Sequence, residues 1–247
     1  MAEKEATNDL DEKITYFRYS GETNTGNLLR EARDRALKRK IGTIIIPYET
    51  GLSALKAIDV FQDSGIRLVV VTHYLDRVSG PRGDIPIGIN RPEYEERRKK
   101  IIGAGVEIVH GTRPFVPPSR IDWTWNSMEG MIDATMELFG SGTKIAIEVA
   151  VMATDAGKVK PGDEIISCDG TYKGLDTALI VRTSNSHKFF EQFEVREIIA
   201  KPRFLVHTDG QYPDENWKGD MEQYYSKKED DGNKGDINGR IWTESRS

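Results

Sequence analysis

The segment "IIIPYETGLSALKAI" (residues 44–58) decides the fold, because a buried-strand pattern changes there into a helical one. Residues 44–47 form a continuous apolar run, which is typical of a strand covered on both faces of a sheet. Apolar residues then recur at helical spacing, at Ala54, Leu55 and Ile58. The polar residues 49–51 between the two patterns predict a strand-to-helix junction.

The same alternation continues on both sides of this junction. Strands are expected at 14–18, 42–47, 67–73, 106–111, 163–168, 177–183 and 193–202, and helices at 26–40, 52–61, 93–102, 128–136 and 143–157. Continuous apolar strands that alternate with helices predict a three-layer α/β/α domain with a mostly parallel, mixed sheet. The late strands lie close together in the chain, so they allow an antiparallel edge pair. The domain is expected to span about 14–204.

The two ends of the chain differ in composition from this domain. Residues 1–13 are expected to form a flexible acidic tail. Residues 205–247 carry many charges and glycines but few aliphatic residues, so they bury too little apolar area to offset the entropy of ordering. We expect this segment to be disordered or loosely packed, and its aromatic residues leave docking on a partner open.

Composition excludes several classes of protein. The 35 basic and 40 acidic residues give a net charge of −5, which offers no general attraction to nucleic acid or to an anionic membrane. The one cysteine, Cys168, rules out an internal disulfide and a cysteine-cluster metal site. No segment approaches the roughly 18 apolar residues that span a bilayer. A cytoplasmic protein is therefore expected, without a metal site and with a homo-oligomer left open.

The junction is also a candidate ligand site. Ligands of open α/β sheets bind outside the carboxyl ends of the strands, and a helix that begins there attracts anions. Gly51 allows a close backbone approach, while Thr50 and Ser53 supply hydroxyl groups that also suit a helix cap. A phosphate or carboxylate is the expected guest. A plain helix cap without a ligand uses the same residue types and stays open.

Two further polar loops follow strands. The loop 168–178 combines glycines with a hydroxyl group and a positive charge, at Gly170, Thr171, Lys173 and Gly174. The loop after the first strand contains Ser20, Asn24 and Thr25, of which Asn24 or Thr25 is placed to cap the next helix. Each loop alone is consistent with a tight turn. Three such loops at strand ends together favour one shared binding site.

These segments resemble, in this order, the C-terminal domain of pyruvate kinase, and still more the stand-alone prokaryotic proteins that consist of that domain and are largely uncharacterised. The resemblance rests on "YFRYSGETNT" (16–25), "ETGLSALKA" (49–57), "VVVTHY" (69–74), the long segment 145–181 and "EVREIIAKPR" (194–203). It covers nearly all of 14–204 and neither tail.

The resemblance implies a mixed sheet of about five main strands and an effector site rather than an active site. In the kinase, a loop similar to Thr50, Gly51 and Ser53 grips the phosphate of an effector, and a loop similar to 170–174 closes over it. Flavin mononucleotide (FMN) is a plausible ligand of the stand-alone relatives. The loop 169–174 is shorter than its kinase counterpart, which weakens the case for a sugar bisphosphate. No catalytic barrel precedes the domain, so pyruvate kinase activity is not expected.

Some residues have side chains suited to catalysis. His73 and His110 each follow a strand, where a shared role in proton transfer or metal binding competes with a role as polar loop caps. Glu148 and Asp155 lie seven residues apart on an apolar helix, so they share nearly one face, where paired carboxylates suit acid–base chemistry or binding of a cation. We expect Glu148 to pair with a basic group or a loop, and Asp155 to lie near the exposed helix end. We expect Cys168 to be a small buried residue rather than a nucleophile.

Three hypotheses of function follow. The first is a binding or regulatory protein that holds a small phosphorylated molecule, FMN or a sugar phosphate, at the strand ends. The second is an enzyme on the same scaffold, dependent on flavin or another phosphorylated ligand, which uses His73 or Glu148. The third is an assembly module that docks through the aromatic tail 205–247. The basic helix segments are expected to be solvated surfaces rather than a nucleic-acid site.

Overall fold

The computed structural model describes residues 10–73, 88–115, 127–171 and 173–204. They belong to one compact unit, Met1–Phe204, whereas a second unit, Leu205–Ser247, lies outside the described residues. The predictions for the tail 205–247 and for residues 1–9 therefore stay predictions.

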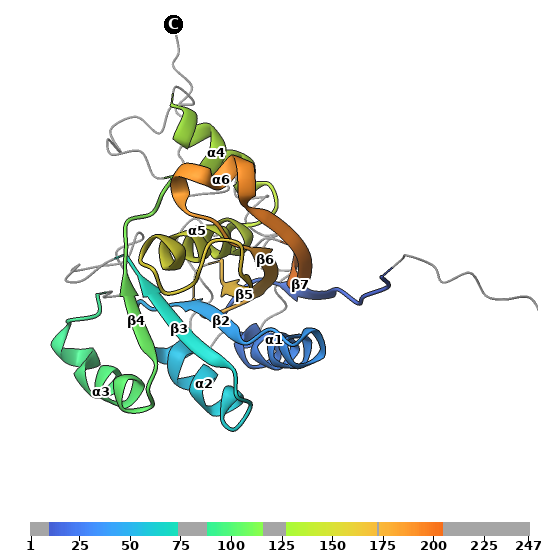
Figure 1. Cartoon of the computed structure of the whole chain (residues 1–247). Coiled ribbons are helices and arrows are strands. Elements are labelled where there is room, and N and C mark those ends of the chain that lie inside the picture. The colour runs from blue at the N-terminus through green and yellow to red at the C-terminus, as the bar shows by residue number, and fades with distance from the viewer. Residues whose placement is uncertain (1–9, 74–87, 116–126, 172, 205–247) are drawn as a thin grey trace, which may run out of the picture. The chain divides into compact units, whose positions relative to one another are not determined.

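A seven-stranded sheet forms the centre of the first unit, with the strand order β1-β7-β6-β5-β2-β3-β4 (Figure 1). The strands are β1 (Thr15–Tyr19), β2 (Thr43–Pro47), β3 (Arg67–Thr72), β4 (Glu107–His110), β5 (Glu164–Asp169), β6 (Thr177–Arg182) and β7 (Glu194–Phe204). β5, β2, β3 and β4 are parallel neighbours, and β1 is parallel to β7. β6 runs antiparallel to both β5 and β7.

Helices cover both faces of this sheet (Figure 1). The helices α1 (Thr25–Arg39), α2 (Leu52–Phe61) and α3 (Glu95–Gly103) lie on one face, and α4 (Met128–Glu137), α5 (Ser141–Asp155) and α6 (Phe189–Gln192) on the other. Short 3-10 turns, η1 (Glu22–Asn24), η2 (Pro92–Tyr94) and η3 (Ser186–Lys188), precede α1, α3 and α6. The predicted three-layer α/β/α class with a mostly parallel, mixed sheet is confirmed.

Two hydrophobic clusters fill the spaces between the layers. The first joins α1 and α2 to the sheet, through buried residues such as Leu28, Ala57 and Ile46. The second joins α5 to the opposite face. Twelve of the fifteen residues of α5 are buried, which explains why its sequence is apolar on nearly all sides. Successive side chains of β2 point to opposite faces of the sheet. Ile44 and Ile46 therefore belong to the first cluster, and Ile45 belongs to the second.

Three sequence expectations need correction. All seven strands expected from the sequence pattern join one sheet, so the count of about five main strands that the resemblance implies is too low. The antiparallel pairing of the late strands lies inside the sheet rather than at its edge. Asn24 occupies the position before α1 but does not cap it, since its Nδ2 atom donates to the Tyr19 carbonyl at 2.8 Å.

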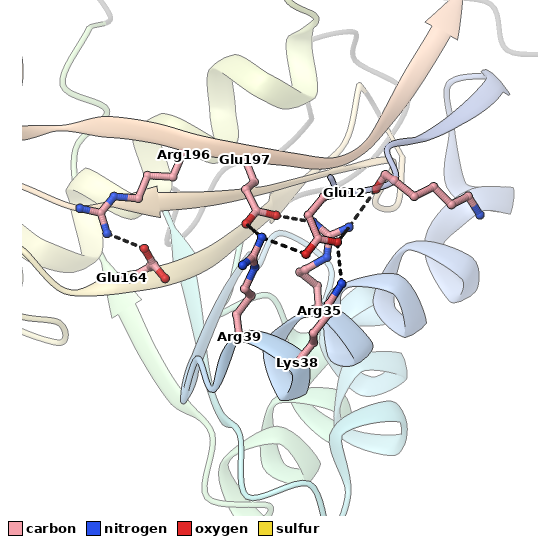
Figure 2. Close-up of polar contacts among 8 residues, drawn as sticks. Glu12, Arg35, Lys38, Arg39, Glu164, Arg196 and Glu197 are labelled. Carbon is pink, nitrogen blue, oxygen red and sulfur yellow. Dashed lines mark hydrogen bonds and ion pairs between the residues drawn. The ribbon is translucent and has the colours of Figure 1, made fainter. Parts of the chain in front are cut away.

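The described end of the predicted acidic tail is attached to α1 (Figure 2). Glu12 pairs with Lys38 at 2.8 Å and with Arg39 at 2.9 Å. Arg39 also pairs with Glu197 of β7 at 2.7 Å. These ion pairs join the chain before β1 to the helix and to the sheet. In the described part of the chain, no helix is both long and apolar enough to cross a membrane.

Candidate ligand-binding site

The carboxyl ends of six strands and the start of β6 lie along one edge of the sheet, which follows from the strand directions. This edge therefore carries all three polar loops that the sequence singles out: 20–25, 49–51 and the loop within 168–178. The open α/β sheet places its ligands at such an edge. We call it the carboxyl edge below.

Gly51 lies at the junction between β2 and α2. It precedes α2 with φ at 83°, a left-handed conformation that glycine adopts without strain. A Cβ atom at this position would lie 2.8 Å from Tyr48 Cε2 and 3.3 Å from Ile101 Cδ1. Among the described residues no side chain caps α2, so neither Thr50 nor Ser53 has the capping role that the sequence allowed. Both side chains are half-buried at the first turn.

Arg97 of α3 adds a positive charge beside this turn. Its Nη1 atom donates to the Thr50 carbonyl at 3.0 Å, and its guanidinium group lies 5.0 Å from the centroid of the Tyr94 ring. The helix dipole of α2 and the charge of Arg97 therefore favour an anion at the same place. A solvated surface, the expectation for this basic segment, describes Lys99, which pairs with Glu95 and Glu96, but not Arg97.

The other two loops pack directly against each other. The Leu175 N–H donates to Thr25 Oγ1 at 3.0 Å. Gly174 has φ at 70°, and a Cβ atom there would lie 2.5 Å from Glu22 Cα. A Cβ atom on Gly170 would lie 2.1 Å from the Gly174 carbonyl oxygen. These two glycines are thus required by packing within the protein itself, and the Thr25 hydroxyl is engaged there too.

Asp176 joins the two loops and is not among the candidate residues of the sequence. Its side chain is fully buried. Its Oδ2 atom accepts hydrogen bonds from the N–H groups of Gly21 at 3.0 Å and Thr171 at 3.1 Å, and its Oδ1 atom accepts one from Thr177 Oγ1 at 2.9 Å. Burial raises the pKa of Asp176, and these hydrogen bonds oppose that rise. The sequence signal for Asp176 is its position directly before the apolar strand β6.

Asp169, at the end of β5, is a second buried acid of this edge. Its Oδ1 atom accepts from the Gly170 N–H at 2.6 Å, whereas Oδ2 has no hydrogen-bond partner among the described residues. Burial raises the pKa of Asp169 well above its usual value, and the charges of Asp176 and Glu49 raise it further. The neutral acid is therefore favoured at this position over a wider pH range than in solution.

His73 follows β3 and contacts the β2 loop. Its Nδ1 atom lies 3.0 Å from Glu49 Oε1. The carboxylate of Glu49 thus orients the imidazole of His73. His110 aligns with Thr72 in the sheet register, and its side chain is exposed. A shared role of the two histidines stays a prediction.

Glu148 lies in a separate buried ion-pair network. Arg113 Nε donates to Glu148 Oε2 at 2.8 Å, and Arg113 Nη2 lies 3.4 Å from Asp133 Oδ1. Lys144 extends the network from Asp133 to Glu137. The prediction that Glu148 pairs with a basic group is confirmed, so this carboxylate serves in packing between α4, α5 and the segment after β4.

The remaining candidates behave as the sequence predicts. Asp155 lies at the exposed end of α5 and accepts from the Ser186 N–H at 3.0 Å. Cys168 is completely buried, and burial raises the pKa of its thiol, so it fills space in the core.

In the described residues no group of three or more His, Cys, Asp or Glu side chains is arranged to hold a metal ion.

The predicted site residues thus fall into two groups on one edge. Ser20, Asn24 and Thr25 lie with the loop of Gly170, Thr171, Lys173 and Gly174, while Thr50, Gly51 and Ser53 lie at α2, near Arg97. His73 contacts the second group through Glu49. The two groups lie on neighbouring strands, β2 and β5, and the charge of Glu49 contributes to the raised pKa of Asp169.

Comparisons with known proteins give only a partial similarity in structure. No protein-family model matches the chain. A pyruvate kinase from Cryptosporidium parvum is similar in structure, with a TM-score of 0.33 and 18% identity over 64% of this chain and 22% of the kinase. The Cryptosporidium parvum pyruvate kinase in complex with ADP gives a TM-score of 0.32 and 19% identity over 64% of this chain and 23% of the kinase. The chain therefore spans under a quarter of these kinases, and the α/β class rests on the sheet described above.

Proposed function

We propose that this protein is a binding or regulatory protein that holds a small phosphorylated molecule at the carboxyl edge, without pyruvate kinase activity. The observation that carries the proposal is the first turn of α2. It lacks a side-chain cap among the described residues, and Arg97 contributes a cation beside it. Backbone N–H groups at a helix start, together with a guanidinium group, suit a phosphate.

The hydroxyl groups of this turn support the same guest. Thr50 and Ser53 are half-buried and can donate to phosphate oxygens. Leu52 between them is 49% exposed, so the turn lies at the surface and not inside the core. The loop of Thr171 and Lys173 borders the neighbouring strand β5 and would contact the rest of the ligand. This arrangement is the one expected for a stand-alone relative of the pyruvate kinase C-terminal domain.

FMN and a sugar phosphate share the phosphate that the proposal requires. Purified protein is to be denatured, and the released small molecules identified by absorbance and mass spectrometry. A yellow preparation that releases FMN supports a flavin protein. Colourless protein is to be titrated with FMN and, separately, with a sugar monophosphate, with calorimetry as the measurement. Absence of binding to both ligands, with no phosphorylated molecule released, would refute the proposal.

Variants test whether the phosphate binds at the first turn of α2. Ser53→Asp places a negative charge in the first turn of α2 and is expected to abolish binding, because it repels the phosphate. Arg97→Met is expected to weaken binding at least about tenfold, as loss of a charge-assisted hydrogen bond predicts. Lys99→Met removes one positive charge from the same helix at an exposed position and is the matched control. Equal affinity in Arg97→Met and Lys99→Met would place the phosphate elsewhere.

The Glu49–His73 pair favours a second candidate, a flavin-dependent or other phosphate-ligand-dependent enzyme. The carboxylate would orient the imidazole for proton transfer to a group of the bound ligand. The ligand that co-purifies is to be incubated with the protein and its products followed by mass spectrometry. Conversion that His73→Gln abolishes, with ligand affinity unchanged, would favour the enzyme over the binding protein.

A further inference from the structure

The sheet opens at the carboxyl edge between β2 and β5. In these two described strands the parallel pairing ends at Ile45 and Ser167, two residues before either strand ends. On their other sides both strands stay paired up to their last residues, β2 with β3 and β5 with β6. We call the ends that are not paired with each other, residues 46–47 and 168–169, the β2–β5 opening.

The backbone explains why the pairing stops there. The Tyr48 N–H donates to the Val71 carbonyl of β3 at 2.7 Å, and successive residues of a strand face opposite neighbours. Pro47 therefore faces β5, but it has no N–H to donate. The next donor of β5 on this side, the Gly170 N–H, is bonded to Asp169 Oδ1 at 2.6 Å instead. Neither strand thus offers the other a donor, so the sequence itself builds the opening.

The place of the β2–β5 opening in the sheet suits a ligand. From β2 the chain runs outward to β3 and β4, and it then returns to β5 on the other side of β2. Strand order therefore reverses at the opening. The helices next to this reversal, α2 and α5, cover opposite faces of the sheet (Figure 1). Open α/β sheets bind ligands at such a point.

Two carboxylate oxygens at the β2–β5 opening lack a hydrogen-bond partner. Asp169 Oδ2 and Glu49 Oε2 are both buried, and neither is bonded to another described residue. Asp169 as a whole is only 6% exposed. Leaving a buried acceptor unpaired destabilises a protein, which points to a donor that the described chain does not supply.

Both acids lie on the face of the sheet that α5 covers. Ser167 donates to a carbonyl of α5 at 2.6 Å, and Asp169, two residues further along β5, points to the same face. Glu49 contacts His73, which follows β3 by one residue. Burial raises the pKa of Asp169, and the charge of Glu49 adds to that rise, as expected for neighbouring carboxylates. The two acids therefore flank the opening, one from β5 and one from β2.

The donor that these acids lack is uncharged. Burial raises the pKa of Asp169, and the positive charge of Arg113 already opposes that rise. Glu49 has His73 beside its other oxygen. A hydroxyl group donates to an ionised carboxylate and accepts from a protonated one, whereas an ammonium group only donates and costs more to bury. Hydroxyl groups therefore fit both acids in either state of ionisation.

We propose that the β2–β5 opening binds the hydroxyl-bearing part of the ligand, whose hydrogen bonds Glu49 Oε2 and Asp169 Oδ2 accept. This inference rests on the proposed phosphate site at the first turn of α2. Glu49 directly precedes Thr50 and Gly51, so one small molecule can place its phosphate at the turn and its nearest hydroxyl groups at the opening. The ligand class is a phosphate monoester of a polyol, which includes sugar monophosphates and the ribityl phosphate of FMN.

The same acids make the β2–β5 opening selective. A second phosphate group on the ligand would enter beside Glu49 and Asp169, and the charge of the buried Asp176 acts at the same place. Like charges that meet in a buried site repel each other strongly. A sugar bisphosphate is therefore expected to bind more weakly than the monophosphate of the same sugar. A site that only attracts phosphate would show the opposite order.

Calorimetric titration of the full chain with three probes tests the inference. Propyl phosphate carries the phosphate monoester without hydroxyl groups, ribose 5-phosphate adds the hydroxyl groups, and ribose 1,5-bisphosphate adds a second phosphate. Ribose 5-phosphate is expected to bind at least about tenfold more tightly than propyl phosphate, as two additional hydrogen bonds predict. The bisphosphate is expected to bind at least about fivefold more weakly than ribose 5-phosphate.

Two variants remove the proposed acceptors. Glu49→Ala is expected to reduce the preference for ribose 5-phosphate over propyl phosphate at least about threefold, without weakening the binding of propyl phosphate. Asp169→Ala is expected to reduce this preference by a similar factor. Glu95→Ala removes an acid from an exposed position of α3 and is the matched control, which keeps the full preference. Circular dichroism checks that each variant is folded, and Glu49→Ala decides if Asp169→Ala is not.

The outcomes separate this inference from the proposed function. Equal affinities for propyl phosphate and ribose 5-phosphate in the parent protein would overturn the inference but leave the phosphate site intact. A preference that survives Glu49→Ala, or a bisphosphate that binds more tightly than the monophosphate, would overturn it too. Absence of binding to all three probes would refute the phosphate site and, with it, the inference that rests on it.

Discussion

The carboxylate of Asp176 accepts a hydrogen bond from the backbone N–H of Gly21, at 3.0 Å and across 155 residues of chain. The same oxygen accepts from the Thr171 N–H, so one buried atom joins the end of β1 to the loop between β5 and β6. The carboxyl edge therefore depends on a residue that contributes geometry and that no ligand needs to touch.

Asp176→Ala leaves buried N–H groups without an acceptor. The free energy of unfolding is expected to fall by about 3 kcal/mol, the cost of leaving buried donors unpaired. Asp176→Asn keeps an oxygen for the two N–H groups and a donor for Thr177 Oγ1, so its loss is expected to stay below about 1 kcal/mol. Urea unfolding followed by circular dichroism measures both. Equal losses in the two variants would show that the hydrogen bonds do not matter.

Gly51→Ala tests the junction between β2 and α2. The positive φ and the contact with Tyr48 are together expected to lower the free energy of unfolding by about 3 kcal/mol. Gly105→Ala separates the two causes, because it has φ at 76° with open space around it and should lose about 1 kcal/mol. Thermal unfolding of both proteins measures the difference. A Gly51→Ala loss no larger than that of Gly105→Ala would contradict the packing argument.

The Arg113–Glu148 pair provides a test of buried charge. Arg113→Met leaves the fully buried Glu148 without its main cationic partner, and a loss of about 3 kcal/mol in unfolding free energy is expected. Combining it with Glu148→Met removes both charges and should recover most of the loss. Guanidinium unfolding of the two single variants and the double variant completes the cycle. Additive losses in the double variant would rule out a direct coupling between the two side chains.

The buried carboxyl group of Asp169 is expected to make the free energy of unfolding depend on pH in a defined direction. Burial raises its pKa in the folded protein above the value in the unfolded chain, so the folded state binds the proton more strongly. Its contribution to stability is therefore complete below the unfolded pKa, about 4, and is lost as pH rises toward the folded pKa. Asp169→Asn keeps the acceptor for the Gly170 N–H but cannot ionise.

The difference in unfolding free energy between Asp169→Asn and the parent protein should accordingly grow in favour of the variant as pH rises above about 4. Chemical unfolding at several pH values between 4 and 8 measures it. Hydrogen bonds with Lys158 and Arg67 lower the pKa of Glu107. Carboxylates of this kind change the unfolding free energy of both proteins equally, so their effect cancels in the difference. A difference that does not vary with pH would contradict the prediction.

The sequence by itself determined the α/β class, because the period of apolar residues decides which segments are strands and which are helices. The run at Ile44–Ile46 and the spacing that follows it are local properties, and so is the need for glycine at position 51. These same local signals placed three polar loops at strand ends, and parallel strands bring such ends to one edge.

Tertiary structure alone decided the partners of the polar side chains. Asp176 meets Gly21, Arg97 meets the Thr50 carbonyl, and Glu12 meets Arg39, in each case across a distance in sequence that local periodicity does not encode. It also decided that β1 joins β7 and that β6 runs antiparallel inside the sheet. Strand order depends on which faces must be buried together, a property of the whole packed chain and not of any one segment.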